Sequence, residues 1–258
     1  MRQAALGLGV LMLASQAAAQ DGWDLDVSPA GDVTVASVTY DGGVGLAVQC
    51  RSGILDVAIL GLPAALPDEI NEYQTRILFT GFDATALEEA PWKASPDSGV
   101  AFSALPQRRA RALKRGGVFL VRTSPPLGTS TPRRLEIPVP TDGAAIDRTL
   151  EACGQKIADP RDDLLLLEDV ISVEEWSRSR LFEMPPSTSW TPTRVEVSCI
   201  VAEAGRVRDC QVESESEPGL GTRMLRDARI VRFGLRENAE VAVGRVIYMV
   251  VQGQRIRR

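Results

Sequence analysis

The stretch of sequence that decides the fold of the carboxyl-terminal part reads RVEVSCIVAEAGRVRDCQVES and spans residues 194–214. In both halves of this stretch apolar and polar residues alternate, which is typical of strands with one buried face. The Ala204-Gly205 pair between the halves favours a tight turn, so we expect a β-hairpin. If the turn centres on this pair, Cys199 and Cys210 lie directly opposite each other, with Cα atoms about 4.5–5.5 Å apart, a separation that a disulfide can span.

A helix and a third strand are expected to follow the hairpin. Apolar residues recur at helical spacing from Leu220 through Met224 and Ala228, which predicts a helix over residues 220–233. Residues 241–252 predict the final strand, and both of its faces are apolar. We expect one face to pack on the helix and the other on a neighbouring domain or a second copy of the chain. A groove for a partner protein is the alternative.

Six short segments between residues 190 and 258 carry a family resemblance: VSCIV (197–201), GRV (205–207), DCQVESE (209–215), LRDA (225–228), VRF (231–233) and VGRV (243–246). In their order and spacing they resemble the TonB C-terminal domain, in a cysteine-containing periplasmic variant. The resemblance implies a ββαβ module that transmits inner-membrane energy to outer-membrane receptors. Such a module pairs with an extended receptor segment through an added strand, a mode called β-augmentation.

The resemblance also implies which strand binds the partner. It is the last one, and the seven residues we expect to form the binding edge are Arg245, Val246, Ile247, Tyr248, Met249, Val250 and Val251. Tyr248 is the expected aromatic contact. We therefore expect a non-enzymatic protein-binding or scaffold protein whose partner is an envelope protein or a segment of an outer-membrane receptor. A homodimer through the same strand is the alternative.

The first twenty residues are typical of a secretory signal peptide. Arg2 precedes an apolar run over residues 4–14, and Ala17-Ala18-Ala19 provides the small residues of a cleavage site. The run is shorter than the roughly 20 apolar residues that a membrane span needs. We therefore expect an exported, periplasmic protein. The alternative is an energy transducer that keeps this segment as an inner-membrane anchor and faces the periplasm.

The chain of 258 residues contains no histidine. This excludes a Ser-His-Asp or Cys-His nucleophile system and a His-ligated zinc or iron site, and it removes the commonest general base. No motif supports catalysis by other residues, so we expect no enzyme, no cofactor and no metal. Residues 190–258 hold nine acidic and twelve basic residues, a balance too weakly basic to indicate nucleic-acid binding.

Four cysteines in an exported chain indicate two disulfides. Of the three possible pairings we expect Cys199 with Cys210, which leaves Cys50 with Cys153. The second bond would close a loop of about 100 residues, for which the chain-entropy model gives about 4–5 kcal/mol of stabilisation. A buried free thiol is the alternative at each position.

The fold class predicted from these patterns is α+β. The first module, residues 21–157, is expected to be mainly β, with helices over residues 103–115 and 144–152. Its predicted strands cover residues 33–40, 44–49, 54–60, 75–80, 100–103, 118–122 and 135–139. Four parts follow along the chain: the signal peptide 1–20, the module 21–157 of unknown role, an acidic connector 158–189, and the TonB-like module 190–258.

Three groups of charged residues are candidate sites, and each has a simpler interpretation that we favour. One group alternates along a strand end and could bind Ca²⁺, although a solvated acidic edge is simpler: Glu213, Glu215 and Glu217. A second could act as paired carboxylates, although neighbouring charges in an acidic connector are simpler: Asp162, Asp163, Glu174 and Glu175. A third could meet anionic lipid, although a solvated helix face is simpler: Arg108, Arg109, Arg111, Lys114 and Arg115.

Overall fold

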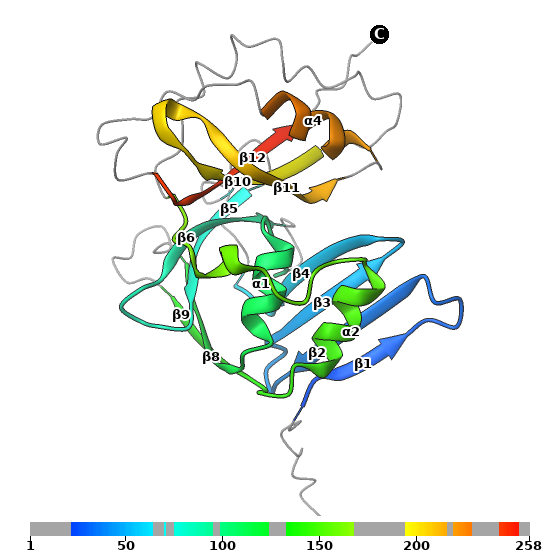
Figure 1. Cartoon of the computed structure of the whole chain (residues 1–258). Helices are drawn as coiled ribbons and strands as arrows, with labels where there is room; N and C mark the ends of the chain where they lie inside the picture. Colours follow the sequence, from blue (N-terminus) through cyan, green and yellow to red (C-terminus); the bar gives the residue numbers. More distant parts are fainter. Residues whose placement is uncertain are drawn as a thin grey trace, which may run out of the picture.

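Two β-sheets and the helices that cover them make up the described part of the chain (Figure 1). The computed structural model describes residues 22–63, 70, 75–94, 99–123, 133–167, 194–215, 219–228 and 243–252. The predicted signal peptide, residues 1–20, and residues 168–189 of the predicted connector lie outside these ranges. No helix within them is long and apolar enough to cross a membrane.

The larger sheet contains nine strands in the order β1-β2-β3-β4-β7-β6-β5-β8-β9, and all neighbours are antiparallel. The strands are β1 (Asp24–Val27), β2 (Val33–Thr39), β3 (Gly45–Arg51), β4 (Ile54–Leu60), β5 (Thr75–Gly81), β6 (Glu88–Ala94), β7 (Ala101–Ser103), β8 (Gly117–Arg122) and β9 (Arg134–Val139). The sheet is curled, so that Tyr40, which directly follows β2, can donate its hydroxyl hydrogen to the carbonyl of Pro138 in β9.

Two helices fill the inside of this curl. They are α1 (Pro106–Leu113) and α2 (Ala144–Ala152), and they lie side by side over the sheet (Figure 1). Leu113 of α1 and Leu150 of α2 are fully buried in one core with Trp92 and Phe119 of the strands. The first predicted helix was placed at residues 103–115, but α1 begins at Pro106, because a proline fits the first helical position, where no N–H partner is needed.

The Cys50–Cys153 disulfide ties β3 to the end of α2, as predicted. The two Cα atoms are 5.5 Å apart, and the residues are separated by 103 positions in the sequence. Both cysteines border the main core, with 4% and 8% of their surface exposed. The first module is thus closed covalently between an early strand and its last helix.

The smaller sheet has three strands in the order β11-β10-β12, and both pairings are antiparallel. Its elements are β10 (Arg194–Val201), the 3-10 turn η3 (Glu203–Gly205), β11 (Val207–Glu215), α4 (Leu220–Ala228) and β12 (Val246–Gln252). The predicted hairpin is confirmed, and Ala204 takes a φ of 55° in its turn. The described part of the chain is thus a mixed fold of helices and mostly strands.

Several predicted boundaries were wrong. The structure contains two strands, β1 and β6, that the sequence patterns did not predict. The last strand begins at Val246 instead of residue 241, because residues 243–244 form a turn in which Gly244 has a φ of 85°. The helix predicted over residues 220–233 is described as far as Ala228, and its remainder lies outside the described residues.

Gly221 in the first turn of α4 lies close against Val212 of β11. A Cβ at Gly221 would lie 2.3 Å from Cγ2 of Val212. We expect Gly221→Ala to lower the free energy of unfolding by about 1–3 kcal/mol through overpacking, although alanine is the better helix former. Urea denaturation would measure it. Adding Val212→Ala should relieve the clash and restore the stability. Thr222→Ala, at the exposed next position, is the control and should change the stability little. A Gly221→Ala variant that is more stable than the wild type would contradict the close packing of α4 on Val212.

Candidate functional site

Apolar and polar side chains alternate along β10, so the smaller sheet has one apolar and one polar face. On one face Val195, Val197 and Cys199 are buried against α4. On the other face the polar residues Glu196 and Ser198 are only 0% and 1% exposed. A carboxylate and a hydroxyl on a buried face need polar partners, because burying them unpaired is unfavourable. Lys93 of the first module supplies a partner for Glu196, and Glu213 of the neighbouring strand β11 supplies one for Ser198.

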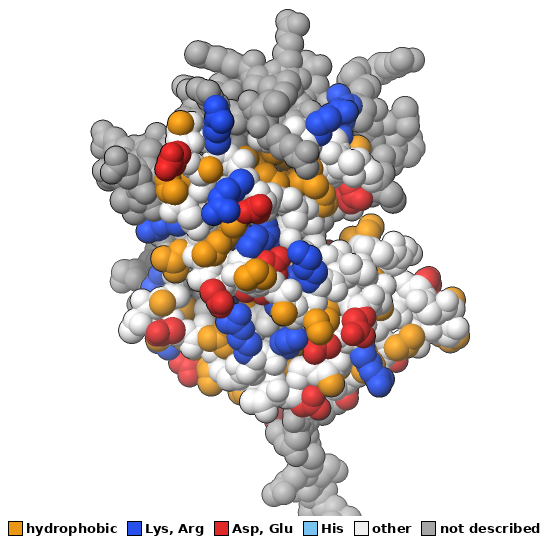
Figure 2. Space-filling view, viewed as in Figure 1, with side chains coloured by type: hydrophobic (Ala, Val, Ile, Leu, Met, Phe, Trp, Pro, Cys, Tyr) orange, Lys and Arg blue, Asp and Glu red, His pale blue; other side chains and the backbone are white. Residues whose placement is uncertain are grey.

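The polar face of the smaller sheet docks on the larger one. Lys93 of β6 lies with its Nζ 2.8 Å from Oε1 of Glu196, and Gln107 of α1 donates a hydrogen bond of 2.8 Å to the carbonyl of Val212. We call this contact the joint; its residues are Lys93, Leu105, Gln107, Arg161, Leu164, Leu166, Glu196, Ser198, Val212, Glu213, Val246 and Tyr248. Figure 2 shows basic and acidic side chains close together across the middle of this face of the molecule.

Two arginines of α1, Arg108 and Arg111, bind the connector instead of facing solvent, while Arg109 lies over the rings of Trp92 and Phe119. Arg111 is 3% exposed, and two of its nitrogens lie 2.6 and 2.8 Å from the carboxylate oxygens of Asp162. Arg108 donates to the carbonyls of Arg161 and Leu164, at 2.9 and 2.7 Å. The expectation of a solvated basic face was wrong here, because the start of the predicted connector folds back over α1 as the 3-10 helix η1 (Pro160–Asp163).

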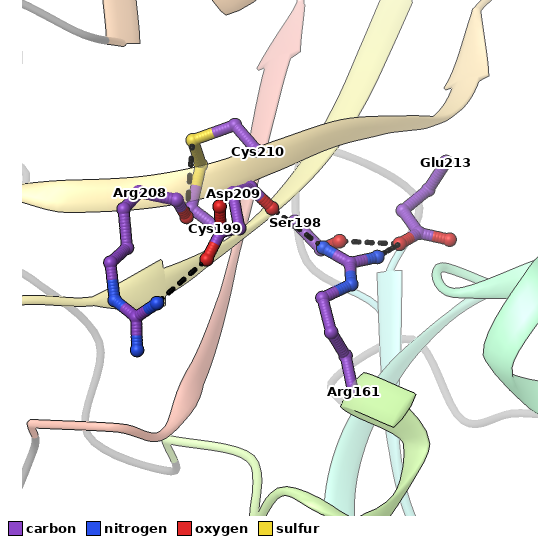
Figure 3. The surroundings of a disulfide bond; sticks show 7 residues. All are labelled: Arg161, Ser198, Cys199, Arg208, Asp209, Cys210 and Glu213. Carbon is purple, nitrogen blue, oxygen red and sulfur yellow. Dashed lines mark hydrogen bonds and ion pairs between the residues drawn. A yellow bond between two sulfur atoms is a disulfide. The ribbon is translucent and has the colours of Figure 1, made fainter. Parts of the chain in front are cut away.

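Arg161 of η1 reaches the hairpin on both sides of Cys210 (Figure 3). Its Nη1 donates to the carbonyl of Asp209 at 2.9 Å, and its Nη2 lies 3.7 Å from Oε1 of Glu213. Its Nε also lies 3.3 Å from the carboxylate of Asp159. Arg161 therefore connects the connector to the smaller sheet through the carbonyl of Asp209 and the carboxylate of Glu213, while its pair with Asp159 lies within the connector.

The Cys199–Cys210 disulfide forms as predicted, beside a bulge that was not predicted. The Cα atoms of the two cysteines are 4.0 Å apart. The register of the hairpin shifts next to them, from Ser198 opposite Gln211 to Ile200 opposite Arg208. The extra residue is Asp209, with a φ of 48°. The bulge aims the carbonyl of Asp209 at Arg161.

Glu213 is, like Glu196, a buried acid of the joint. Ser198 and Gln211 both donate hydrogen bonds to its Oε1, while its Oε2 is buried without a hydrogen-bond partner in the described structure. Burial raises the pKa of the Glu213 carboxyl, against the opposing effects of the Ser198 hydroxyl and the Arg161 and Arg111 guanidinium groups. The expectation of a solvated acidic edge was wrong for this residue, which is 4% exposed.

The three acids considered for Ca²⁺ do not converge in the described structure. A second register shift lies between Glu196 and Val197, so that Glu213 faces Ser198 on the side of the joint while Glu215 faces the start of α4. Glu215 instead accepts hydrogen bonds from the N–H groups of Gly219 and Gly221 at the start of α4. Glu217 lies outside the described residues, as do Glu174 and Glu175.

The predicted binding strand β12 lies at one edge of the smaller sheet. It pairs with β10 from Val246 opposite Ile200 to Gln252 opposite Arg194. On its other side, the pairing found among the described residues is a parallel bridge between Val246 and Leu166. Both backbone groups of Val246 take part, with N···O distances of 2.8 Å to the residues on either side of Leu166.

The bridge at Val246 fixes which backbone groups of β12 face outward. Because orientation alternates along a strand, the N–H and C=O groups of Tyr248, Val250 and Gln252 point the same way as those of Val246, away from β10. Arg245 has the opposite orientation, since its carbonyl accepts a hydrogen bond of 2.9 Å from the N–H of Val201. Of the seven predicted residues, those with outward backbone groups are Val246, Tyr248 and Val250; the other four face β10.

The side chains of β12 pack on both faces, as the sequence suggested. Ile247 and Met249 are buried with the residues of α4. Val246 packs in the joint with Leu105 of the first module and Leu166 of the connector. The half-buried Tyr248 packs on the same small cluster.

Comparison with known proteins gives no family assignment. No protein-family model matches the chain. No curated protein and no solved structure matches it either. The function is therefore argued from the geometry of β12 and the joint.

Proposed function

We propose that this chain is a non-enzymatic protein-binding or scaffold protein of the cell envelope. In this proposal residues 190–258 act as a TonB C-terminal-like module that pairs with an extended segment of an envelope protein along β12. The observation that carries the proposal is the position of β12: within the described ranges, no strand flanks it opposite β10 beyond the bridge at Val246.

An outer edge of this kind can accept a further strand. Backbone groups that point outward from an edge strand can pair with another extended chain, and their hydrogen bonds supply affinity without requiring a pocket. The order β10, β11, α4, β12 supports the comparison with the TonB C-terminal domain, and two disulfides suit a protein of an oxidising compartment.

Val250→Pro is expected to abolish partner capture while the smaller sheet stays folded. Proline removes the outward N–H and places its ring where a partner strand would lie, and an edge strand tolerates this change. Capture would be measured in the cells that make the protein, with a photo-crosslinking amino acid at Leu165, whose side chain is 62% exposed beside the bridge. We expect Val250→Pro to reduce the crosslink to one recurring peptide of an envelope protein at least tenfold (an order-of-magnitude estimate).

Two matched variants separate edge pairing from unfolding. Val250→Ala keeps the N–H and should retain the crosslink. Met249→Pro removes an N–H on the side that pairs with Val197, so it should destabilise the sheet itself. A crosslink that persists undiminished in Val250→Pro would refute pairing along β12.

A further inference from the structure

Glu213 is a carboxyl group at the centre of a contact between two sheets. We propose that Glu213 makes docking of the smaller sheet on the first module proton-linked, so that the joint tightens as the pH falls and loosens as the pH rises. The inference concerns the joint alone and does not depend on a partner binding to β12.

The surroundings of Glu213 leave its charge poorly compensated. The charged groups that face it are Glu196 of β10, Arg161 and Asp162 of η1, and Arg108 and Arg111 of α1. Arg111 forms a bidentate ion pair with Asp162, so its charge is already balanced by another carboxylate. Arg161, at 3.7 Å, is shared with Asp159 and the carbonyl of Asp209.

The neutral neighbours of Glu213 stabilise its charged form through one of the two carboxylate oxygens only. Ser198 and Gln211 both donate to Oε1, and the buried Oε2 has no hydrogen-bond partner in the described structure. A buried carboxylate with one unsatisfied oxygen is costly, and protonation removes most of that cost. The joint therefore favours the protonated form of Glu213 more than water does.

The direction of the pH effect follows from this preference. In the docked form burial raises the pKa of Glu213 above its ordinary 4.5, while in an undocked form the polar face would meet water. The docked form then binds the proton more tightly, so docking takes up a proton. The stabilisation is complete below the ordinary pKa and is lost as the pH rises through the raised pKa.

Because of the composition of the chain, a pH response of docking can be assigned to a carboxyl group. The chain contains no histidine, the residue that most often gives proteins a pH response between 5 and 8. Among the described residues, burial raises the carboxyl pKa of Glu213 and of Asp56 in β4. Asp56→Asn is therefore the matched comparison for Glu213→Gln.

Hydrogen exchange at two backbone amides would measure docking. The N–H of Val246 donates to Leu165, and the N–H of Leu167 donates to Val246, so both amides report the contact of β12 with the connector. Protection factors, which already correct for the intrinsic effect of pH on exchange, would be read by NMR at pH 5 and pH 7.5. We expect protection at pH 5 to exceed that at pH 7.5 by at least about threefold in the wild type and in Asp56→Asn, and to be equal at the two pH values in Glu213→Gln.

Arg161 gives a second and independent test. Its guanidinium favours the charged form of Glu213, so Arg161→Gln should move the pH midpoint of protection upward, and Arg161→Lys should leave it near the wild-type value. Three results would each overturn the proposal. The midpoint could fail to move in Arg161→Gln, protection in the wild type could stay constant or rise with pH, or Glu213→Gln could keep the full pH response. If Glu213→Gln does not fold, the carbon-13 shift of the Glu213 carboxyl in the wild type decides: a midpoint above 4.5 supports the linkage, and one at or below it refutes it.

Discussion

Arg111→Met is expected to lower the free energy of unfolding by about 3–5 kcal/mol, because it leaves a buried carboxylate without its cation. The Arg111 side chain is 3% exposed and that of Asp162 is 8% exposed, and their closest N···O distance is 2.6 Å. The guanidinium holds both carboxylate oxygens of Asp162. Urea denaturation at pH 7, followed by circular dichroism, measures the loss.

The double variant Arg111→Met/Asp162→Leu tests the reason for that loss. Removing both charges replaces the ion pair with apolar contacts, a change that is often neutral, so we expect most of the stability to return. Arg115→Met is the matched surface control: its pair with Asp163 spans 3.6 Å, with 59% and 81% of the side chains exposed, and should contribute less than about 1 kcal/mol. If Arg111→Met proves as mild as Arg115→Met, the pair with Asp162 does not stabilise the contact between α1 and the connector.

The parts of the fold that depend on local patterns were predictable. The hairpin, α2 and most strands follow from hydrophobic period, and the pairing of Cys199 with Cys210 follows from the position of the turn. The strand β6 could not be found this way. Its sequence, EEAPWKA, contains a proline and three charges, and it becomes a strand because β5 and β7 pair with its two sides.

The contact between α1 and the connector was missed for a different reason. Arg111 and Asp162 are far apart in the sequence, and each belongs to a charged segment that looked solvated when considered by itself. The available signal was complementarity: a helix with arginines at 108, 111 and 115 and an acidic run at 159–163 are natural partners. The register shift that puts Glu213 and Glu215 on different faces left no such signal, because nothing in the residues of β10 or β11 marks it.

Removing the Cys50–Cys153 disulfide, as Cys50→Ala/Cys153→Ala, is expected to lower the free energy of unfolding by about 4–5 kcal/mol. The bond joins residues 103 positions apart, so its loss frees a long loop in the unfolded chain. Urea denaturation of the variant against the oxidised wild type measures the effect. Because both cysteines are nearly buried, at 4% and 8% exposure, a mild reductant should not reproduce it without unfolding the module.

The second disulfide provides the comparison that tests this explanation. Cys199 and Cys210 are separated by only 11 positions, so the same loop entropy predicts a smaller loss of about 3 kcal/mol for Cys199→Ala/Cys210→Ala. The short bond also holds the bulge whose carbonyl binds Arg161, so its removal should reduce the protection of the Val246 and Leu167 amides as well. If the short bond proves the more stabilising of the two, its contribution comes from positioning the bulge in the folded protein, and loop entropy in the unfolded chain is the minor effect.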